Sequence, residues 1–293
     1  MDSAMLAFLA APFVASLILT GIHAYLGVHV VERGVIFVDL SLAQIAALGA
    51  AVAILLPVTS GDPHAPAVYW ISLGFTFIGA AVFSTIRGHR ARIPQEAIIG
   101  ICYAVASAAS ILAMSKATSE SEHLKDMLVG NILAVSWSEV GETAVLYGAI
   151  GIFHYIFRKK FLAISLDHQH TATHGLSVRL CDFLFYASFG FVVTSSVAIA
   201  GVLLVFCYLI VPSVAAMLYA DTVGRRLAIG WTMGTIVSAL GVYLSLVLDL
   251  PTGATIVCPF GGALALMALG RPLIRRTSEA GAQRAPLEAR AAR

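Results

Sequence analysis

The sequence carries little charge for its length. Only 12% of its 293 residues are charged, whereas 59% are apolar and the mean hydropathy is +0.90. A soluble globular domain has about twice that share of charged residues, so the composition excludes this class. Lipid cannot satisfy backbone polar groups, and the long continuous apolar runs exclude a transmembrane barrel. The sequence therefore predicts an all-α polytopic membrane bundle.

The sequence also lacks the local motifs of the common enzyme classes. It contains no G-x-x-x-x-G-K-[ST] phosphate loop, no H-E-x-x-H and no G-x-S-x-G elbow. The four cysteines stand singly in apolar runs without a C-x-x-C pair, which is typical of core thiols. They are Cys102, Cys181, Cys207 and Cys258. We expect no enzymatic activity, no ATP hydrolysis by the chain itself and no cofactor bound to it.

Nine apolar segments of 16 to 26 residues are predicted to cross the membrane, since a crossing takes about 20 helical residues. The predicted crossings are Met5–Val30, Val35–Leu56, Ala67–Ile86, Glu96–Met114, Glu139–Phe157, Leu180–Ser196, Ala198–Ala220, Leu227–Leu248 and Ala254–Leu269. A further apolar piece, Met127–Ser136, is too short to cross and is predicted to be re-entrant or interfacial.

The distribution of basic residues predicts the orientation of these crossings. Lys and Arg beside short loops are retained on the cytosolic side of a membrane. With the N-terminus outside, 16 of the 18 basic residues fall in inner loops or the C-terminal tail, and only Lys116 and Lys125 lie outside. We therefore expect the C-terminus to be inside. Residues 1–276 are predicted to form a single transmembrane domain, followed by a disordered cytosolic tail at 277–293.

The longest polar segment between the two apolar halves is Arg158–Arg179, which the same rule places in the cytosol. One interpretation of its histidines is a regulatory metal site. The other, which we favour, is a short helix capped by Asp167 and ended by Gly175. Such a helix, lying along the membrane surface, would suit docking into a soluble partner. The histidines are His168, His170 and His174.

Asp39 is the first candidate for a substrate path, because a charge in the hydrocarbon costs on the order of 2.5 to 3.5 kcal/mol at a helix centre. The alternative is a carboxylate near the inner interface that pairs with Arg33 or a neighbouring helix. Gln44 follows five residues later, about 140° round a helix, so these two side chains are not expected to hold one ion directly together.

Histidines on the first predicted crossing are further candidates. His23 and His29 carry imidazoles, which suit zinc and other first-row metals, but each is also compatible with a hydrogen-bonded interior histidine. The outer loops hold oxygen and nitrogen donors that would guide a cation or simply be solvated. They are Asp62, His64, Glu120, Glu122 and His123.

Six stretches of the sequence carry motifs that can be compared with known families. They are GVHVVERGVIFVDLSLAQIAALG (27–49), PQEAIIGI (94–101), VGNILAVSW (129–137), LDHQHTATHGLSVRLCDFL (166–184), AIAGVLLVFCYLIVPSVAAMLYA (198–220) and Gly241 and Ser245 with DLPTGATIV (249–257). Together they resemble the permease subunit of bacterial ABC importers for zinc, manganese or iron, and the similarity covers nearly the whole chain. The segment 94–101 is similar to that family's E-D-x-x-I-G-I motif, and the segment 166–184 is similar to its cytosolic coupling helix.

The second predicted helix departs from the family pattern, which reads G-D-x-L-S-H followed by P-G. Aligned on Gly49, this chain has Asp39 in place of the Gly and Leu40 in place of the Asp. Gln44 replaces the His and Leu48 the Pro. The acidic group is displaced by about 100° round the helix, and a neutral amide is a poorer zinc ligand than imidazole. Metal selectivity therefore does not carry over.

The resemblance implies a homodimer in the bacterial inner membrane that moves a divalent cation (Zn, Mn or Fe). Two cytosolic ATPase subunits would supply ATP hydrolysis and an extracytoplasmic binding protein would deliver the metal; membrane lipid surrounds the bundle and no nucleic acid is involved. The expected path residues are Asp39, Gln44, His23 and, at the outer mouth, Asp249. The expected coupling residues are Asp167, His168, Ala172, His174 and Gly175.

Two other classes remain as alternatives. An ion-gradient-driven secondary transporter would also be polytopic, but we find no matching pair of broken helices of the kind such folds use. A membrane-embedded enzyme would need a convergent catalytic set, which one aspartate and scattered histidines do not supply.

Overall fold

The computed structural model describes residues 3–59, 62, 65–86, 94–115, 132–166 and 178–291. Within these ranges the chain is helical and has no strand. The helices are α1 (Ser3–Glu32), α2 (Val38–Ile54), α3 (Pro66–Ile86), α4 (Gln95–Met114), α6 (Trp137–Ile156), α7 (Arg158–Leu166), α8 (Val178–Met217), α9 (Val223–Leu248) and α10 (Thr252–Ala291), with 3-10 turns η1 (Pro57–Thr59) and η2 (Ile132–Ala134).

The helices confirm the predicted class of an all-α membrane bundle. Six of the described helices are long and apolar enough to cross a membrane, and the bent pair α6–α7 makes a seventh. Counting the shorter apolar helix α2 and the second half of α8 separately brings the number to the predicted nine. The sides on which the loops lie stay a prediction.

Helix α8 corrects one predicted boundary. Its 40 residues would extend about 60 Å as a straight helix, roughly twice the thickness of a bilayer core. The backbone breaks at Gly201, with φ 74° and ψ 161°, a conformation open essentially to glycine. The sequence placed the junction of the sixth and seventh crossings at residue 197. The structure keeps that residue helical and turns the chain four residues later, where a side chain is absent.

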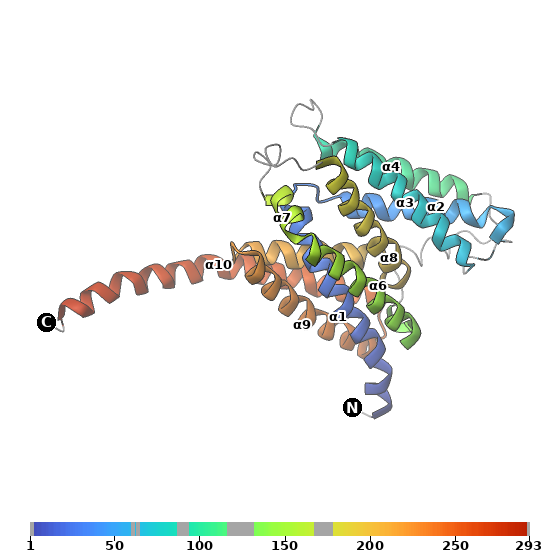
Figure 1. Cartoon of the computed structure of the whole chain (residues 1–293). Coiled ribbons are helices and arrows are strands. Elements are labelled where there is room, and N and C mark those ends of the chain that lie inside the picture. Colours follow the sequence, from blue (N-terminus) through green and yellow to red (C-terminus); the bar gives the residue numbers. More distant parts are fainter. Residues whose placement is uncertain are drawn as a thin grey trace.

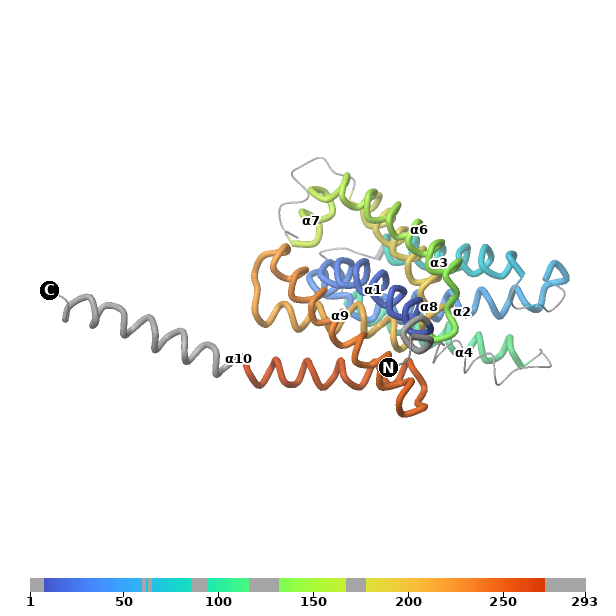
Figure 2. The backbone as a smooth tube through the Cα atoms, turned by 90° about the horizontal axis from the view of Figure 1, so that it is seen from below, coloured from blue at the N-terminus to red at the C-terminus, as the bar shows by residue number. Residues whose placement is uncertain are grey.

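The long helix α8 lies at the centre of the bundle. It packs against α1, α2, α3, α9 and α10, so that α2–α4 are gathered on one side of it and α1, α6, α9 and α10 on the other (Figures 1 and 2). Its aromatic residues are among the largest fully buried side chains of the described core. Tyr186, Tyr208, Phe185 and Phe189 are all fully buried. A helix buried over most of its surface has a nearly continuous apolar sequence, as this one does.

Most helix ends follow the predicted segments closely. Helix α6 begins two residues before the predicted crossing because Ser136 forms a capping box with Glu139. The loop between α4 and η2, the segment 167–177 and the donors His64, Glu120, Glu122 and His123 lie outside the described residues. The predicted boundary between transmembrane domain and tail at residue 277 falls in the part of α10 whose side chains are not described, so it stays a prediction.

Helices α1 and α8 approach each other closely at Gly27. A Cβ placed there would lie 1.9 Å from the carbonyl oxygen of Leu209 and 2.3 Å from Oγ of Ser213. The closest atom belongs to the backbone of α8, which cannot rotate away from a new methyl group as a flexible side chain can. Gly21, one and a half turns earlier on α1, has no atom within 4 Å of such a Cβ. The packing requirement is thus confined to one face of α1.

We expect Gly27→Ala to destabilise the bundle by about 1 to 3 kcal/mol, the usual cost of overpacking, and Gly21→Ala to be neutral. Thermal unfolding of the two purified variants in detergent, followed by size-exclusion chromatography, measures both effects. Equal midpoints for the two variants would contradict the close approach of α1 and α8.

Candidate functional site

Asp39 lies in the first turn of α2 and is 1% exposed. Its Oδ1 atom has no hydrogen-bond partner among the described residues. The backbone N–H of Phe37, the N-cap of α2, donates to Oε1 of Glu96 on α4 at 3.1 Å. Two carboxylates therefore meet the N-terminal end of α2, where the helix dipole favours negative charge. Asp39 is held in the bundle interior with capacity for another ligand.

Gln44 is also buried, at 6% exposure, within the surface of α2 that packs against α3, α4 and α8. The structure thus places both predicted path residues of α2 inside the bundle. The structure does not show the alternative pair between Asp39 and Arg33. The guanidinium of Arg33 forms its ion pair with Asp182 instead.

His23 occupies a hydrogen-bonded niche between α1, α6 and α8. Its Nδ1 lies 2.8 Å from the carbonyl oxygen of Leu19, so this nitrogen donates, and Nε2 lies 3.2 Å from Oγ of Ser196. The Tyr147 hydroxyl joins the same cluster, 3.0 Å from Oγ of Ser195. Both ring nitrogens of His23 are therefore engaged in this conformation, as expected for an interior histidine, and its role on a path stays a prediction.

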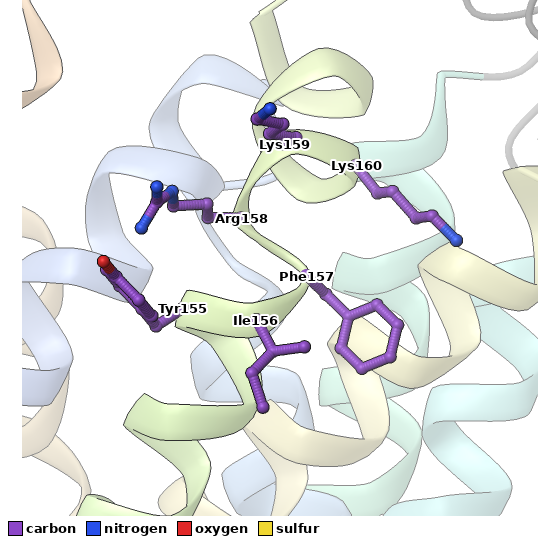
Figure 3. A pocket seen from close by; sticks show the side chains of 6 residues that line it. All are labelled: Tyr155, Ile156, Phe157, Arg158, Lys159 and Lys160. Atoms are coloured by element: carbon purple, nitrogen blue, oxygen red, sulfur yellow. The ribbon is translucent and has the colours of Figure 1, made fainter.

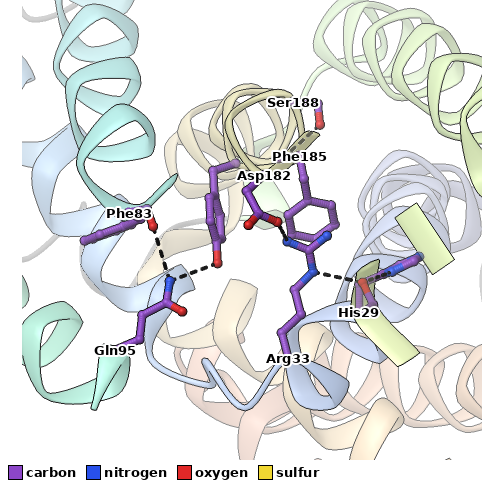
Figure 4. A network of polar contacts seen from close by, with 9 residues as sticks. His29, Arg33, Phe83, Gln95, Asp182, Phe185 and Ser188 are labelled. Atoms are coloured by element: carbon purple, nitrogen blue, oxygen red, sulfur yellow. Dashed lines mark hydrogen bonds and ion pairs between the residues drawn. The ribbon is translucent and has the colours of Figure 1, made fainter. Parts of the chain in front are cut away.

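A buried ion pair joins the end of α1 to the start of α8 (Figure 4). Nη1 of Arg33 lies 2.8 Å from Oδ1 of Asp182, and the two side chains are 1% and 0% exposed. Nε of Arg33 donates to Oγ of Ser165 in the last turn of α7 at 2.9 Å. The guanidinium also stacks 3.9 Å from the ring centroid of Phe185. One arginine thus holds α7 and α8 to α1.

A second set of polar side chains surrounds Tyr25 next to this pair. The ring of Tyr25 meets those of His29 and His154 edge-on, with centroids 4.8 and 5.4 Å away. Nδ1 of His29 lies 2.9 Å from Ser165 Oγ, and Nε2 of His154 lies 2.8 Å from Ser188 Oγ. The other ring nitrogens and the tyrosine hydroxyl are buried without a described partner. Buried polar groups of this kind are usually bridged by water.

Asp249 terminates α9 in a left-handed conformation with φ 51°. The turn behind it is fastened by Ser245, whose Oγ donates to the carbonyl of Leu250 at 2.7 Å and lies 2.9 Å from Oγ1 of Thr252. A Cβ on Gly241 would lie 2.7 Å from Cα of Ile256. The motif built on Gly241, Ser245 and DLPTG therefore explains the tight α9–α10 corner, and Asp249 itself is exposed.

The predicted ligands do not converge on one point in the described part of the chain. Asp39, His23 and Asp249 belong to different niches, and no group of three or more His, Cys, Asp or Glu among the described residues is arranged to hold a metal ion. The predicted coupling residues, at positions 167, 168, 172, 174 and 175, lie outside the described residues, and so does the proposed helix that carries them.

A model of the ABC 3 transport family matches residues 5–269. The chain belongs to the ABC 3 transport family. The match covers every described apolar helix, so the resemblance inferred from the motifs is confirmed. This family member is a multi-pass membrane protein, a membrane component of a transport system.

Curated relatives of this ABC 3 family chain are membrane proteins of metal transport systems. The chelated iron transport system membrane protein YfeC of Yersinia pestis is 29% identical over 197 residues, covering 67% of this chain and 65% of the relative. The manganese transport system membrane protein MntC of Listeria innocua is 29% identical over 196 residues, covering 64% and 69%. The chain thus matches about two thirds of the length of these relatives.

The fold of this ABC 3 family chain is similar to that of a solved structure, PsaBC from Streptococcus pneumoniae in complex with Fab. The TM-score is 0.74 at 23% sequence identity, and the match covers 89% of this chain and 90% of the other. At this identity the likeness concerns the fold alone.

The sequence did not predict which residues far apart in the chain contact one another. Arg33 and Ser165 are 132 residues apart, and Arg33 and Asp182 are 149 apart. Arg33 and Asp182 carry one sequence signal, a charged side chain at the edge of an apolar run, and Ser165 carries none. Tyr25 and His29 carry a clearer signal, since a spacing of four residues puts them on one face of a helix.

We expect Asp182→Asn to destabilise this ABC 3 family chain by about 3 to 5 kcal/mol, because it leaves the Arg33 guanidinium buried beside a neutral partner. The matched control is Arg226→Gln, which breaks a partly exposed pair with Glu32 and should cost at most about 1 kcal/mol. Detergent-solubilised thermal unfolding compares the two. A larger loss for the control than for Asp182→Asn would contradict the buried pair's role.

Proposed function

We propose that the chain is the permease subunit of an ABC importer that moves a divalent transition-metal cation across the bacterial inner membrane. Separate cytosolic ATPase subunits supply the energy, and an extracytoplasmic binding protein delivers the metal to a homodimer of this chain. Family membership supports the transport role. The manganese and chelated-iron relatives support a metal substrate, with zinc, manganese and iron as the candidates.

The observation that carries this proposal is the buried, partly unpartnered carboxylate of Asp39. An ionised carboxylate in a membrane bundle is costly unless a cation or hydrogen-bond donor meets it. Carboxylate oxygens suit manganese and the harder divalent ions. With the predicted orientation, α2 runs outward from the cytosolic side, so a cation delivered from outside would meet Gln44 before it reaches Asp39 at the inner end of the helix.

Coupling to the ATPases would pass through the polar network at Arg33. Its guanidinium touches Ser165 near the end of α7 and Asp182 near the start of α8, one on each side of the segment 167–177. The same arginine directly follows the last residue of α1 and stands six residues before Asp39. A displacement of the α7–α8 junction by a docked ATPase would therefore be passed to the N-terminal turn of α2.

The first test of this function replaces Asp39. We expect Asp39→Asn to lower metal uptake by at least about tenfold at limiting metal, equivalent to about 1.4 kcal/mol of lost ion stabilisation, while basal ATP hydrolysis of the complex continues. Uptake of zinc, manganese and iron into proteoliposomes holding the full complex is the measurement.

Two variants frame the Asp39 test. Asp39→Glu keeps the charge and should retain part of the uptake, and Glu142→Gln, at an exposed carboxylate of α6, should leave it unchanged. ATP-independent uptake driven by an ion gradient would contradict the importer proposal and would indicate a secondary transporter. Wild-type uptake by Asp39→Asn would remove Asp39 from the path.

The second test concerns the segment proposed to dock the ATPase. We expect His174→Trp or Gly175→Trp to abolish ATP-driven uptake without affecting membrane insertion, because a bulky side chain would keep a short helix out of its groove. Gly224→Trp, at an exposed glycine of α9 with open space around it, is the control. Unchanged uptake and unchanged co-purification of the ATPase in the first two variants would count against docking at this segment.

A further inference from the structure

The bend between α6 and α7 has basic side chains that belong neither to the proposed metal path nor to the polar contacts of Arg33. Helix α6 ends at Ile156, and α7 leaves it at an angle of 74° after one residue, Phe157. Three consecutive basic residues, Arg158–Lys160, open α7, and all three are exposed. Figure 3 shows their side chains fanning out from the bend above Ile156 and Phe157.

The charges at this bend are unbalanced. The first turn of α7 contains no acidic residue, and none of the ion pairs between described residues involves Arg158, Lys159 or Lys160. Basic side chains at a helix N-terminus also oppose the helix dipole, which itself favours an anion there. Two of the basic side chains make cation–π contacts. Arg158 lies 4.1 Å from the ring centroid of Tyr155, and Lys160 lies 5.7 Å from that of Phe157.

A pocket of about 430 Å³ opens at the bend. Its lining has two halves, the basic residues Arg158–Lys160 on α7 and the apolar or aromatic residues 155–157 at the end of α6. A small polar anion would use the first half alone. A molecule with an anionic group next to hydrocarbon would use both.

The apolar half of the pocket continues along the outer face of α6. Val145, Ile152 and Ile156 are 75%, 64% and 68% exposed. Their spacings of seven and four residues put them in one stripe on the helix. In a membrane-spanning helix this stripe faces lipid, and it leads directly to the basic residues at the bend.

We propose that the α6–α7 bend binds the phosphate headgroup of an anionic phospholipid, whose acyl chain lies along the stripe of α6. Arg158 and the two lysines hold the phosphate, and Tyr155 and Phe157 flank it at the level of the interface. The positive-inside distribution of basic residues predicts that the bend lies at the cytosolic leaflet, where anionic lipids attract basic segments. An acidic surface of a protein partner would match the charges but not the apolar stripe, so the lipid fits the pocket better.

The test measures lipid binding to the purified full-length chain, without metal and without ATPase subunits. Native mass spectrometry in detergent counts retained phosphatidylglycerol against phosphatidylcholine of the same chain length. We expect the wild type to retain phosphatidylglycerol selectively. The variant Arg158→Gln, Lys159→Gln, Lys160→Gln should bind it about fivefold more weakly for each basic residue removed.

Controls separate this pocket from general surface charge. Arg225→Gln removes an exposed basic residue at the start of α9 and should leave lipid retention unchanged. Inorganic phosphate should not displace the lipid, because it has no chain to lie on α6. The single variants Arg158→Gln and Lys160→Gln, each with an expected fivefold loss, replace the triple variant if that one does not insert.

Three results would overturn the proposal. They are wild-type retention of phosphatidylglycerol by the basic-residue variants, an equal loss with Arg225→Gln, and displacement of the lipid by inorganic phosphate. If the basic-residue variants retain lipid as the wild type does but fail to co-purify an ATPase subunit in a separate pull-down, the basic side chains belong to a protein-docking surface and the lipid proposal is wrong. Since neither metal nor ATPase is present in the lipid assay, its outcome is independent of the transport function proposed above.

Discussion

The ion pair between Arg33 and Asp182 is the contact on which the buried polar contacts between α1, α7 and α8 depend. A charge inside an apolar bundle is tolerated when an opposite charge and further hydrogen bonds accompany it. Arg33 meets this condition with Asp182, Ser165 and the face of Phe185. In doing so it ties the end of α1 to residues of α7 and α8 that come 132 and 149 residues later in the chain.

Asp39 is also a buried carboxylate, but unlike Asp182 it forms no ion pair with a described residue. It sits six residues after Arg33, yet its Oδ1 is left without a described partner. Structural charges are balanced within the fold, whereas a group that must receive and release a cation cannot be permanently neutralised. The difference between these two acids supports a structural role for Asp182 and a place for Asp39 on the path. In the proposed mechanism, the short link between Arg33 and Asp39 would connect the α7–α8 junction to the metal path.

The sequence predicted the helices well where one apolar run corresponds to one crossing. The limits of α1, α3 and α4 agree with the predicted segments within a few residues, because apolar composition and flanking Pro or charged residues determine them. The α8 break was misplaced, since nothing in the run around Val197 distinguishes a helical residue from a turn. The decisive feature is the positive φ of Gly201, and the sequence alone does not tell which glycine of a long apolar run adopts it.

The sequence by itself determined that this chain is an all-α membrane protein of a transport family and which residues carry its few charges. These properties follow from composition, local motifs and the cost of placing polar groups in lipid. Only the tertiary structure decided which charge meets which partner, because Arg33, Ser165 and Asp182 come together through the packing of three helices. The same packing engaged both nitrogens of His23, left an oxygen of Asp39 unpartnered and joined the cations of α7 to the apolar face of α6 at one bend.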